Sequence, residues 1–307
     1  MKVCVCIPAR YGSTRFTGKV LAQDTGKFLI QHTYEQACRA KLPHKVIIAA
    51  DDHRVAAAAE SFGAECVLTS PDHQSGTDRI AEAIEKLADS GQRTADSPRD
   101  TLRWKSKKLN TIRYTLNADD IVVNLQADEP EIDPANIDYL AQLLIDHPSY
   151  PMATLAASFQ TTDQIANPNI VKVIVAWSVR RGADSRKLKT QNSKLKTDYG
   201  MAIYFSRLPI PYDREKSGIG NINQYLRHLG IYAYRKDFLL KITKMPQSNL
   251  EKIEKLEQLR AIENGFPILV GKVNHTHDGI DTPQQYAEFV KRYKSHRGHR
   301  RRRNINE

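Results

Sequence analysis

The chain has 307 residues, and its hydrophobic content of 40% and charged content of 26% are ordinary for a globular protein. No apolar run approaches the roughly 20 residues that cross a membrane, and the first residues lack the apolar core and cleavage site of a signal peptide. The four cysteines form no C-x-x-C pair, which favours reduced packing residues over metal ligands or disulfides. We therefore expect a cytoplasmic protein without a membrane partner, built as an α/β domain with a smaller subdomain.

The net charge of +11 is unevenly distributed along the chain. Residues 99–113 carry a net charge of +5, residues 180–196 of +6 and residues 291–303 of +8. The remainder of the chain is therefore net −8. Because the basic residues belong to two insertion-like segments and a tail, we expect no nucleic-acid partner for the body of the protein.

The first hundred residues alternate between strand and helix patterns. Strands are predicted from Val3 to Ile7, over 45–50 and over 65–68, and helices near 27–41, over 53–62 and from Asp78 onward. This alternation predicts a mainly parallel twisted sheet with helices on both faces. Residues 91–118 are polar and interrupt the pattern, which indicates an excursion from the domain.

The sheet resumes with a strand over 120–126, followed by a helix near 134–146 and a strand near 152–158. The second half has short strands at 170–177, 200–205 and 228–235, with a second polar and basic excursion at 180–198. Helices are predicted near 236–244, 249–264 and 282–294, with a strand near 267–273. A spacing of three residues from Leu250 to Ile262, through Ile253, Leu256 and Leu259, predicts one packing stripe on the helix at 249–264. We assign residues 1–295 to one domain and residues 296–307 to a disordered basic tail.

The loop after the first strand contains two glycines and three cations, Arg10, Arg15 and Lys19. Backbone N–H groups, cationic side chains and a following helix can together hold a polyphosphate. The loop is not a P-loop, because Val20 follows Lys19 where that motif requires Ser or Thr. A solvated surface loop remains the alternative.

Two carboxylates and a polar loop complete the candidate site. Asp128 follows a buried strand, and Asp281 precedes a helix with Pro283 at its start. One or two carboxylates together with phosphate oxygens suit Mg²⁺, although Asp128 could instead cap a turn and Asp281 a helix. The loop from Ser70 to Arg79 can read a base or a sugar through its hydroxyl, amide and backbone groups.

Seven segments, taken in order, resemble the 3-deoxy-manno-octulosonate (Kdo) cytidylyltransferases, the CMP-Kdo synthetases of Gram-negative bacteria. They are residues 8–15 with 18–19, 72–79, 124–130, 204–207 with 210–211, 227–234, 256–260 and 281–283. The resemblance covers residues 1–293 apart from the two excursions. It implies a Rossmann-like nucleotidyltransferase fold with a smaller sugar-binding and dimerisation subdomain.

The resemblance also implies a reaction: transfer of CMP from CTP to Kdo with Mg²⁺, releasing pyrophosphate, in lipopolysaccharide precursor synthesis by a homodimer. Residues around the CTP phosphates would be Arg10, Ser13, Arg15 and Lys19. Those near the cytidine would be Gln74, Ser75, Gly76 and Arg79. Mg²⁺ would be held by Asp128 and Asp281, and the catalytic group would comprise Lys19, Arg10 and Asp128. The sugar pocket would be lined by Gln126, Arg207, His228, Tyr232, Glu257 and Gln258.

The chain departs from the family pattern at Phe16-Thr17, where Leu-Pro is usual, and at Ala127, where Gly is usual. Neither change removes a charged group, so we expect activity, with a less rigid phosphate loop. Two other functions stay open. One is transfer of CMP to a related acid sugar, such as an amino-substituted Kdo or a sialic acid. The other is an inactive scaffold that binds nucleic acid through its basic segments.

Overall fold

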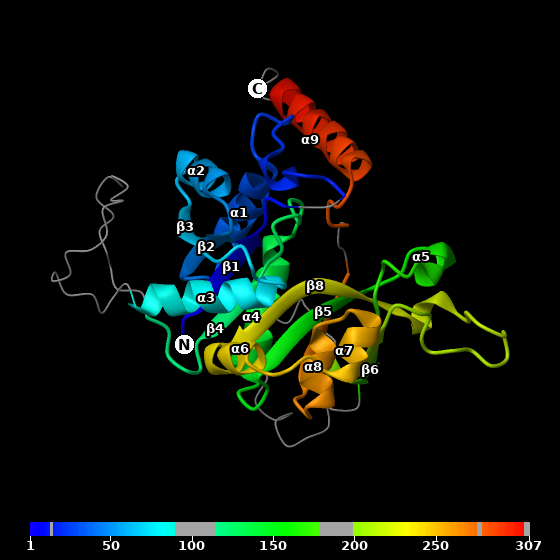
Figure 1. Cartoon of the computed structure of the whole chain (residues 1–307). Coiled ribbons are helices and arrows are strands. Elements are labelled where there is room, and N and C mark those ends of the chain that lie inside the picture. Colours follow the sequence, from blue (N-terminus) through cyan, green and yellow to red (C-terminus); the bar gives the residue numbers. More distant parts are fainter. Residues whose placement is uncertain (13–14, 90–114, 178–198, 275–277, 304–307) are drawn as a thin grey trace.

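The computed structural model describes the backbone of residues 1–12, 15–89, 115–177, 199–274 and 278–303. Outside these ranges lie Ser13, most of the first polar excursion and all of the second. Within them, one nine-stranded sheet runs through the protein in the order β3-β2-β1-β4-β8-β5-β9-β7-β6 (Figure 1). The strands are β1 (Val3–Ala9), β2 (Lys45–Ala50), β3 (Glu65–Leu68), β4 (Ile121–Asn124), β5 (Met152–Ser158), β6 (Lys172–Ala176), β7 (Tyr199–Ser206), β8 (Leu226–Arg235) and β9 (Ile268–Val273).

The first four strands of the sheet, β3, β2, β1 and β4, are all parallel. Beyond β4, strand β8 runs antiparallel to both β4 and β5, and β5 pairs in parallel with β9. Strand β7 then runs antiparallel to both β9 and β6. The α/β class expected from the sequence is confirmed, and the parallel pairing is concentrated in the N-terminal half, which has the β-α-β alternation.

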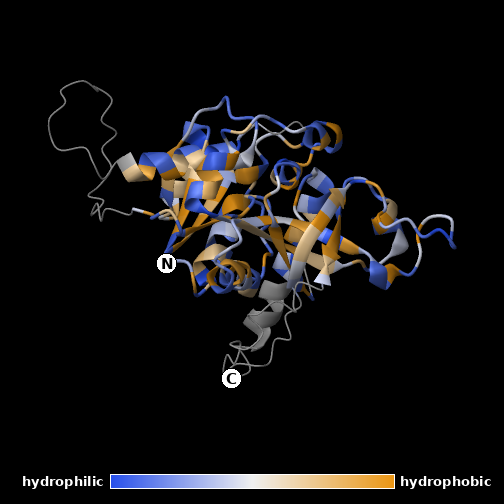
Figure 2. Cartoon of the chain, turned by 90° about the horizontal axis from the view of Figure 1, so that it is seen from below, coloured by the Kyte–Doolittle hydropathy of each residue, from blue (hydrophilic) through white to orange (hydrophobic). Residues whose placement is uncertain are grey.

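Helices cover both faces of the sheet, as expected. They are α1 (Leu29–Arg39), α2 (His53–Ser61), α3 (Gly76–Asp89), α4 (Pro134–Asp146), α5 (Thr162–Ala166), α6 (Lys236–Ile242), α7 (Asn249–Glu254), α8 (Gln258–Glu263) and α9 (Pro283–Arg303). On one face of β1, Val3, Val5 and Ile7 belong to a hydrophobic core cluster that includes residues of α1, α2 and α4. Cys4 and Cys6 point to the other face, in the cluster that contains α3, α6 and α8. In Figure 2 the strands are largely hydrophobic, and the helices alternate between hydrophobic and hydrophilic residues.

The single helix predicted over 249–264 is wrong, because two short helices occupy this stretch. Lys255 adopts a left-handed conformation with φ of 54° and ends α7 before α8 begins. The break interrupts the expected packing stripe: Leu256 and Leu259 are buried, whereas Ile253 is 77% exposed. Arg207 stabilises the break, because its Nε donates to the carbonyl of Glu254 at 2.6 Å and its Nη2 to that of Lys255 at 3.3 Å.

Helix α9 lies beside the N-terminal loop region (Figure 1). Tyr286 and Phe289 of this helix are buried with Leu29 and Ile280, and the Phe16 ring packs against Tyr286 at 5.7 Å between centroids. The helix continues through residues 296–303, the stretch expected from the sequence to form a basic tail, and the division of the chain at residue 295 stays a prediction. Across the described parts of the chain, no helix combines the length and the apolar character needed to span a membrane.

Candidate active site

Lys19 lies where three distant parts of the chain meet. It begins a short 3-10 helix, Lys19–Leu21, directly after Gly18, whose φ of 68° suits a glycine. Its ammonium donates to Asp128 Oδ2 at 2.6 Å, to Asp281 Oδ1 at 2.9 Å and to the carbonyl of Ile280 at 2.9 Å. The loop after β1, the turn after β4 and the start of α9 are thus joined through one cation.

The two carboxylates expected to hold a metal therefore converge, with a cation between them. Burial acts to lower the pKa of Lys19, but Asp128 and Asp281 outweigh it and raise the net pKa above its usual value. Arg15 also reaches this cluster, with Nη2 at 3.1 Å from Asp281 Oδ2. No group of three or more His, Cys, Asp or Glu side chains suited to a metal occurs among the described residues.

Arg10 is exposed at the carboxyl end of β1. Within the described ranges it forms no hydrogen bond or ion pair, which leaves its guanidinium available to an anion. Ser13 lies outside the described residues. The structure therefore brings Arg15 and Lys19 to the two carboxylates and places Arg10 at the start of the same loop.

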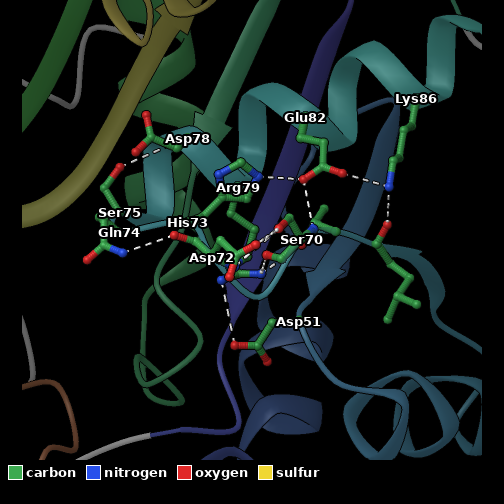
Figure 3. A network of polar contacts seen from close by, with 12 residues as sticks. Asp51, Ser70, Asp72, His73, Gln74, Ser75, Asp78, Arg79, Glu82 and Lys86 are labelled. Atoms are coloured by element: carbon green, nitrogen blue, oxygen red, sulfur yellow. Dashed lines mark hydrogen bonds and ion pairs between the residues drawn. The ribbon is translucent and has the colours of Figure 1, made fainter. Parts of the chain in front are cut away.

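The segment expected to lie near the base runs from the end of β3 into α3 (Figure 3). Gln74 is exposed and donates from Nε2 to the carbonyl of Asp72 at 3.0 Å. Ser75 Oγ accepts from the backbone N–H of Asp78 at 3.1 Å, in the first turn of α3. A Cβ added at Gly76 would lie 3.2 Å from Pro8 Cγ, so the glycine permits close packing of this helix start on β1.

Arg79 is fully buried, in contrast to Gln74. Its Nη1 donates to Thr69 Oγ1 at 2.8 Å and to the carbonyl of Ser70 at 3.0 Å. Burial lowers the pKa of its guanidinium from the usual value, and Nη2 lies 3.6 Å from Asp51 Oδ2. Protein groups thus satisfy Nη1, whereas Nε and Nη2 have no hydrogen-bond partner among the described residues.

Four residues predicted for the sugar pocket lie along β8 and at the start of α8. The Tyr232 hydroxyl donates to Gln258 Oε1 at 3.1 Å, and the His228 and Tyr232 rings are 5.3 Å apart. Gln258 is buried, and its Nε2 has no hydrogen-bond partner among the described residues. Glu257 accepts from Ser75 Oγ at 3.1 Å and from Thr77 Oγ1 at 2.8 Å, and so joins this group to the segment expected to lie near the base.

The other two predicted pocket residues have different surroundings. Gln126, after β4, donates from Nε2 to Asn124 Oδ1 at 2.9 Å. Arg207 directs its guanidinium at the backbone carbonyls of Pro168, Glu254 and Lys255. Its placement in the sugar pocket stays a prediction, while its contacts support the turn that leads to Glu257 and Gln258.

Burial disfavours ionised side chains in this part of the site. It lowers the pKa of His228 to about 3, while the imidazole Nε2 lies 3.0 Å from Thr154 Oγ1. Burial raises the pKa of Glu257 above its usual value, and that of Glu129 to about 8 with a further contribution from Asp128. A neutral imidazole and phenol hydroxyls can hydrogen-bond a polyhydroxylated molecule at neutral pH.

Sequence reasoning missed Asp51, Thr77 and the ion pair between Arg227 and Asp278, which joins Nη2 to Oδ1 at 2.5 Å. Asp51 accepts from the backbone N–H of Tyr11 at 2.9 Å. Its position at the carboxyl end of a parallel strand was a usable signal, because ligands bind at that edge of such sheets. Thr77 and Arg227 lie inside segments of the family pattern, but residue type alone does not reveal their partners.

Comparison with known proteins shows the family of this chain. A family model described as Cytidylyltransferase matches residues 4–98 and 105–272. A 3-deoxy-manno-octulosonate cytidylyltransferase from Thermodesulfovibrio yellowstonii is 42% identical over 284 residues, which cover 92% of this chain and 94% of that relative. One from Solibacter usitatus is 39% identical over 295 residues, covering 96% of this chain and 95% of that relative.

Solved structures show the same relationship. The structure of CMP:2-keto-3-deoxy-manno-octonic acid synthetase complexed with CTP superposes with a TM-score of 0.74 at 35% identity, covering 96% of this chain and all of that one. A cytidylyltransferase from Leptospira borgpetersenii, at 16% identity and a TM-score of 0.50 over 93% of this chain and 84% of that one, shares the fold alone. The chain belongs to the 3-deoxy-manno-octulosonate cytidylyltransferase family, a family of nucleotidyltransferases.

Proposed function

We propose that the protein transfers CMP from CTP to Kdo, giving CMP-Kdo and pyrophosphate. The observation that carries the proposal is the Lys19 ammonium between Asp128 and Asp281, at the end of a loop that also holds Arg10 and Arg15. A triphosphate bound there would meet cations from the loop and carboxylates suited to its metal. The relatives and the CTP-bound structure reported above supply the identity of the two substrates.

In this reaction the anomeric hydroxyl of Kdo attacks the α-phosphorus of CTP. A new O–P bond forms, the bond to the β-phosphate oxygen breaks, and pyrophosphate leaves with its electron pair while the hydroxyl proton is lost. Both substrates are anionic, so their approach depends on charge neutralisation and positioning. Arg10 and Arg15 would clamp phosphate oxygens in the bidentate manner of guanidinium groups, and Lys19 would act as a point charge.

Asp128 and Asp281 would hold Mg²⁺, and the structure fits this role because their carboxylates already converge on one cation. Two carboxylates completed by substrate phosphate oxygens and water are a usual environment for Mg²⁺. When bound, the ion would neutralise phosphate charge and lower the pKa of the sugar hydroxyl.

The sugar would bind at the buried end of the site. Gln126, His228, Tyr232 and Gln258 offer amide, imidazole and phenol groups for its hydroxyls, and Glu257 offers a carboxylate already in contact with the base-binding segment. Neutral His228 and Tyr232 would orient the sugar by hydrogen bonds. The negative charge of its carboxylate would be balanced by cations of the phosphate loop.

We further propose a cytoplasmic homodimer that serves lipopolysaccharide precursor synthesis, without a nucleic-acid partner. Ile203 is 52% exposed and Leu208 and Tyr212 more than 60%, on β7 and the loop after it. Exposed large apolar side chains such as these are suited to contact with a second subunit.

A pyrophosphate-release assay with CTP, Mg²⁺ and Kdo tests the reaction. We expect release with this combination and little with ATP, GTP or UTP in place of CTP. Replacing Kdo by an amino-substituted Kdo or a sialic acid tests the sugar, and faster release with either would transfer the assignment to that acid sugar. No pyrophosphate with any acid sugar would contradict the proposal.

A further inference from the structure

Asp51 holds the beginning of the loop that carries Arg10, Arg15 and Lys19. It directly follows β2, and its backbone N–H donates to the carbonyl of Ala9, the last residue of β1, at 3.3 Å. Its Oδ1 accepts from the backbone N–H of Tyr11 at 2.9 Å. The carboxylate therefore fixes the chain where it leaves the sheet and enters this loop.

Tyr11 in turn joins the two ends of the loop. Its carbonyl accepts from the backbone N–H of Gly18 at 3.0 Å, directly before Lys19. A Cβ at Gly18 would lie 3.3 Å from the Tyr11 ring, and the Arg54 guanidinium lies 3.5 Å from the centroid of that ring. A displacement of Tyr11 would consequently displace Lys19.

The other oxygen of Asp51 faces the base-binding segment. Oδ2 lies 3.6 Å from Arg79 Nη2, and both groups are visible in Figure 3. Arg79 is fully buried, and its Nε and Nη2 have no hydrogen-bond partner among the described residues. A buried guanidinium needs a nearby negative charge to offset its lost hydration, and Asp51 provides one.

Arg79 also holds the chain that precedes α3. Its Nη1 donates to Thr69 Oγ1 and to the carbonyl of Ser70. One turn later on α3, Glu82 accepts from the backbone N–H of Ser70 at 2.8 Å, and the His73 imidazole lies against the same carboxylate (Figure 3). The segment from Ser70 to Ser75 is thus attached to α3 at two successive turns.

We propose that Asp51 and Arg79 are a positioning pair that couples the phosphate-binding loop to the base-binding segment, and that Arg79 acts through Asp51 and Ser70 without contacting cytidine. The inference rests on the proposed function. In this arrangement, one oxygen of the Asp51 carboxylate contacts the phosphate-binding loop, and the other faces Arg79 of the base-binding segment. Loss of the Asp51 charge loosens the loop that holds the triphosphate and leaves the buried Arg79 charge with Glu82 as a weaker compensating carboxylate.

The test measures CTP affinity directly, by calorimetry with CTP and Mg²⁺ in the absence of sugar, together with KM for Kdo at saturating CTP. Asp51→Asn keeps an oxygen acceptor for Tyr11 and removes the charge, and we expect CTP to bind 5- to 10-fold more weakly. Asp51→Ala removes both contacts, with an expected loss of 30-fold or more. KM for Kdo should stay within twofold in both variants.

A matched control is Asp138→Asn. Asp138 likewise fixes distant backbone, accepting from the N–H groups of Lys41 and Leu42, but it lies away from both loops. This variant should lose thermal stability and bind CTP like the parent protein. Arg79→Met and the double variant Asp51→Asn/Arg79→Met complete a double-mutant cycle. The affinity of the double variant for CTP should be about equal to that of the single variant that binds CTP more weakly.

Three results would overturn the inference. The CTP affinity of Asp51→Asn and Asp51→Ala could match that of Asp138→Asn, which would show that Asp51 has only a structural role. The fold losses in CTP affinity from Asp51→Asn and Arg79→Met could multiply in the double variant, which would show that the two residues act independently. The parent protein itself could fail to bind CTP, and this result, seen before any variant is compared, would refute the proposed function instead of the coupling alone.

Discussion

The phosphate end and the sugar end of the site differ in charge and in exposure to solvent. At the phosphate end, ionised groups meet at a partly open surface: the Asp281 side chain is 45% exposed and that of Arg15 is 60% exposed. At the sugar end, His228 and Gln258 are buried, and burial disfavours the charged forms of His228 and Glu257.

This difference shows how one site can serve two kinds of substrate. Ion pairs near solvent exchange partners at small cost, so we expect the exposed Arg15 to leave Asp281 for a phosphate oxygen when CTP arrives. Hydrogen bonds between buried neutral groups have a fixed direction, and a missing partner costs the full desolvation of the group left behind. We therefore propose that charge attracts the triphosphate, while buried neutral groups select the sugar.

The largest expected effect is at the phosphate end. Asp128→Asn should lower kcat by about 10³-fold, because it removes a carboxylate proposed to hold the metal and leaves Lys19 with one acidic partner fewer. Pyrophosphate release at varied Mg²⁺ measures it. Asp133→Asn, which alters a nearby helix-capping carboxylate, is the control, and normal turnover by the Asp128 variant would remove Asp128 from the mechanism.

At the sugar end, we expect a pH-dependent stability that His228 controls. Its folded pKa of about 3 lies below the unfolded value of 6.5, so below pH 6.5 the unfolded state binds more protons. The free energy of unfolding should therefore fall as pH falls through this window, with a His228 contribution of about 1.4 kcal/mol per pH unit. Urea unfolding at several pH values should show this slope reduced in His228→Asn and kept in a variant of the exposed His53. An identical slope in His228→Asn and the parent would contradict a buried neutral imidazole.

A smaller effect is expected for Tyr232→Phe, which removes the hydroxyl that orients Gln258. Loss of one hydrogen bond, about 1 kcal/mol, should raise KM for Kdo about fivefold and leave KM for CTP unchanged. Steady-state kinetics with each substrate varied in turn measure the two constants. Tyr225→Phe removes another buried hydroxyl, bonded to the carbonyl of Pro211, and should change neither constant. An equal rise in both constants for Tyr232→Phe would show that the two ends are not separate.

The smallest effect concerns the loop itself. Phe16→Ala removes the ring that packs on Tyr286, and we expect a two- to threefold rise in KM for CTP with a loss of about 1 kcal/mol in the free energy of unfolding. Phe62→Ala deletes another partly buried ring, packed on Phe28 and Tyr34, and should cost stability without changing KM for CTP. An unchanged KM in Phe16→Ala would mean that α9 does not order the loop.

Much of the architecture and the phosphate end could be predicted from the sequence. Buried β-branched runs with acids at their ends mark parallel strands, and the carboxyl ends of such strands lie at one edge of the sheet, which placed Lys19 beside Asp128. Asp281 joins them from beyond the ninth strand. Phe16, which replaces a usual Leu, packs on α9, and this contact gives the loop a support that its missing proline does not provide.

The remaining features depend on long-range contacts that periodicity does not encode. The left-handed Lys255 splits one predicted helix into two, although lysine rarely adopts this conformation, and carbonyl contacts from the distant Arg207 stabilise it. The burial of Arg79 is equally invisible in the sequence, because its environment comes from Asp51 and Thr69 on two other strand ends.

The closure of Lys19 on Asp281 bears on the order of events during synthesis. The two residues are separated by 262 positions, so a nascent chain contains Lys19, Arg15 and Asp128 long before Asp281 is made. Until α9 has emerged, the phosphate loop lacks both its second carboxylate and the aromatic contact of Phe16. The contacts that complete the surroundings of Lys19 can therefore form only after all nine strands of the described sheet have been synthesised.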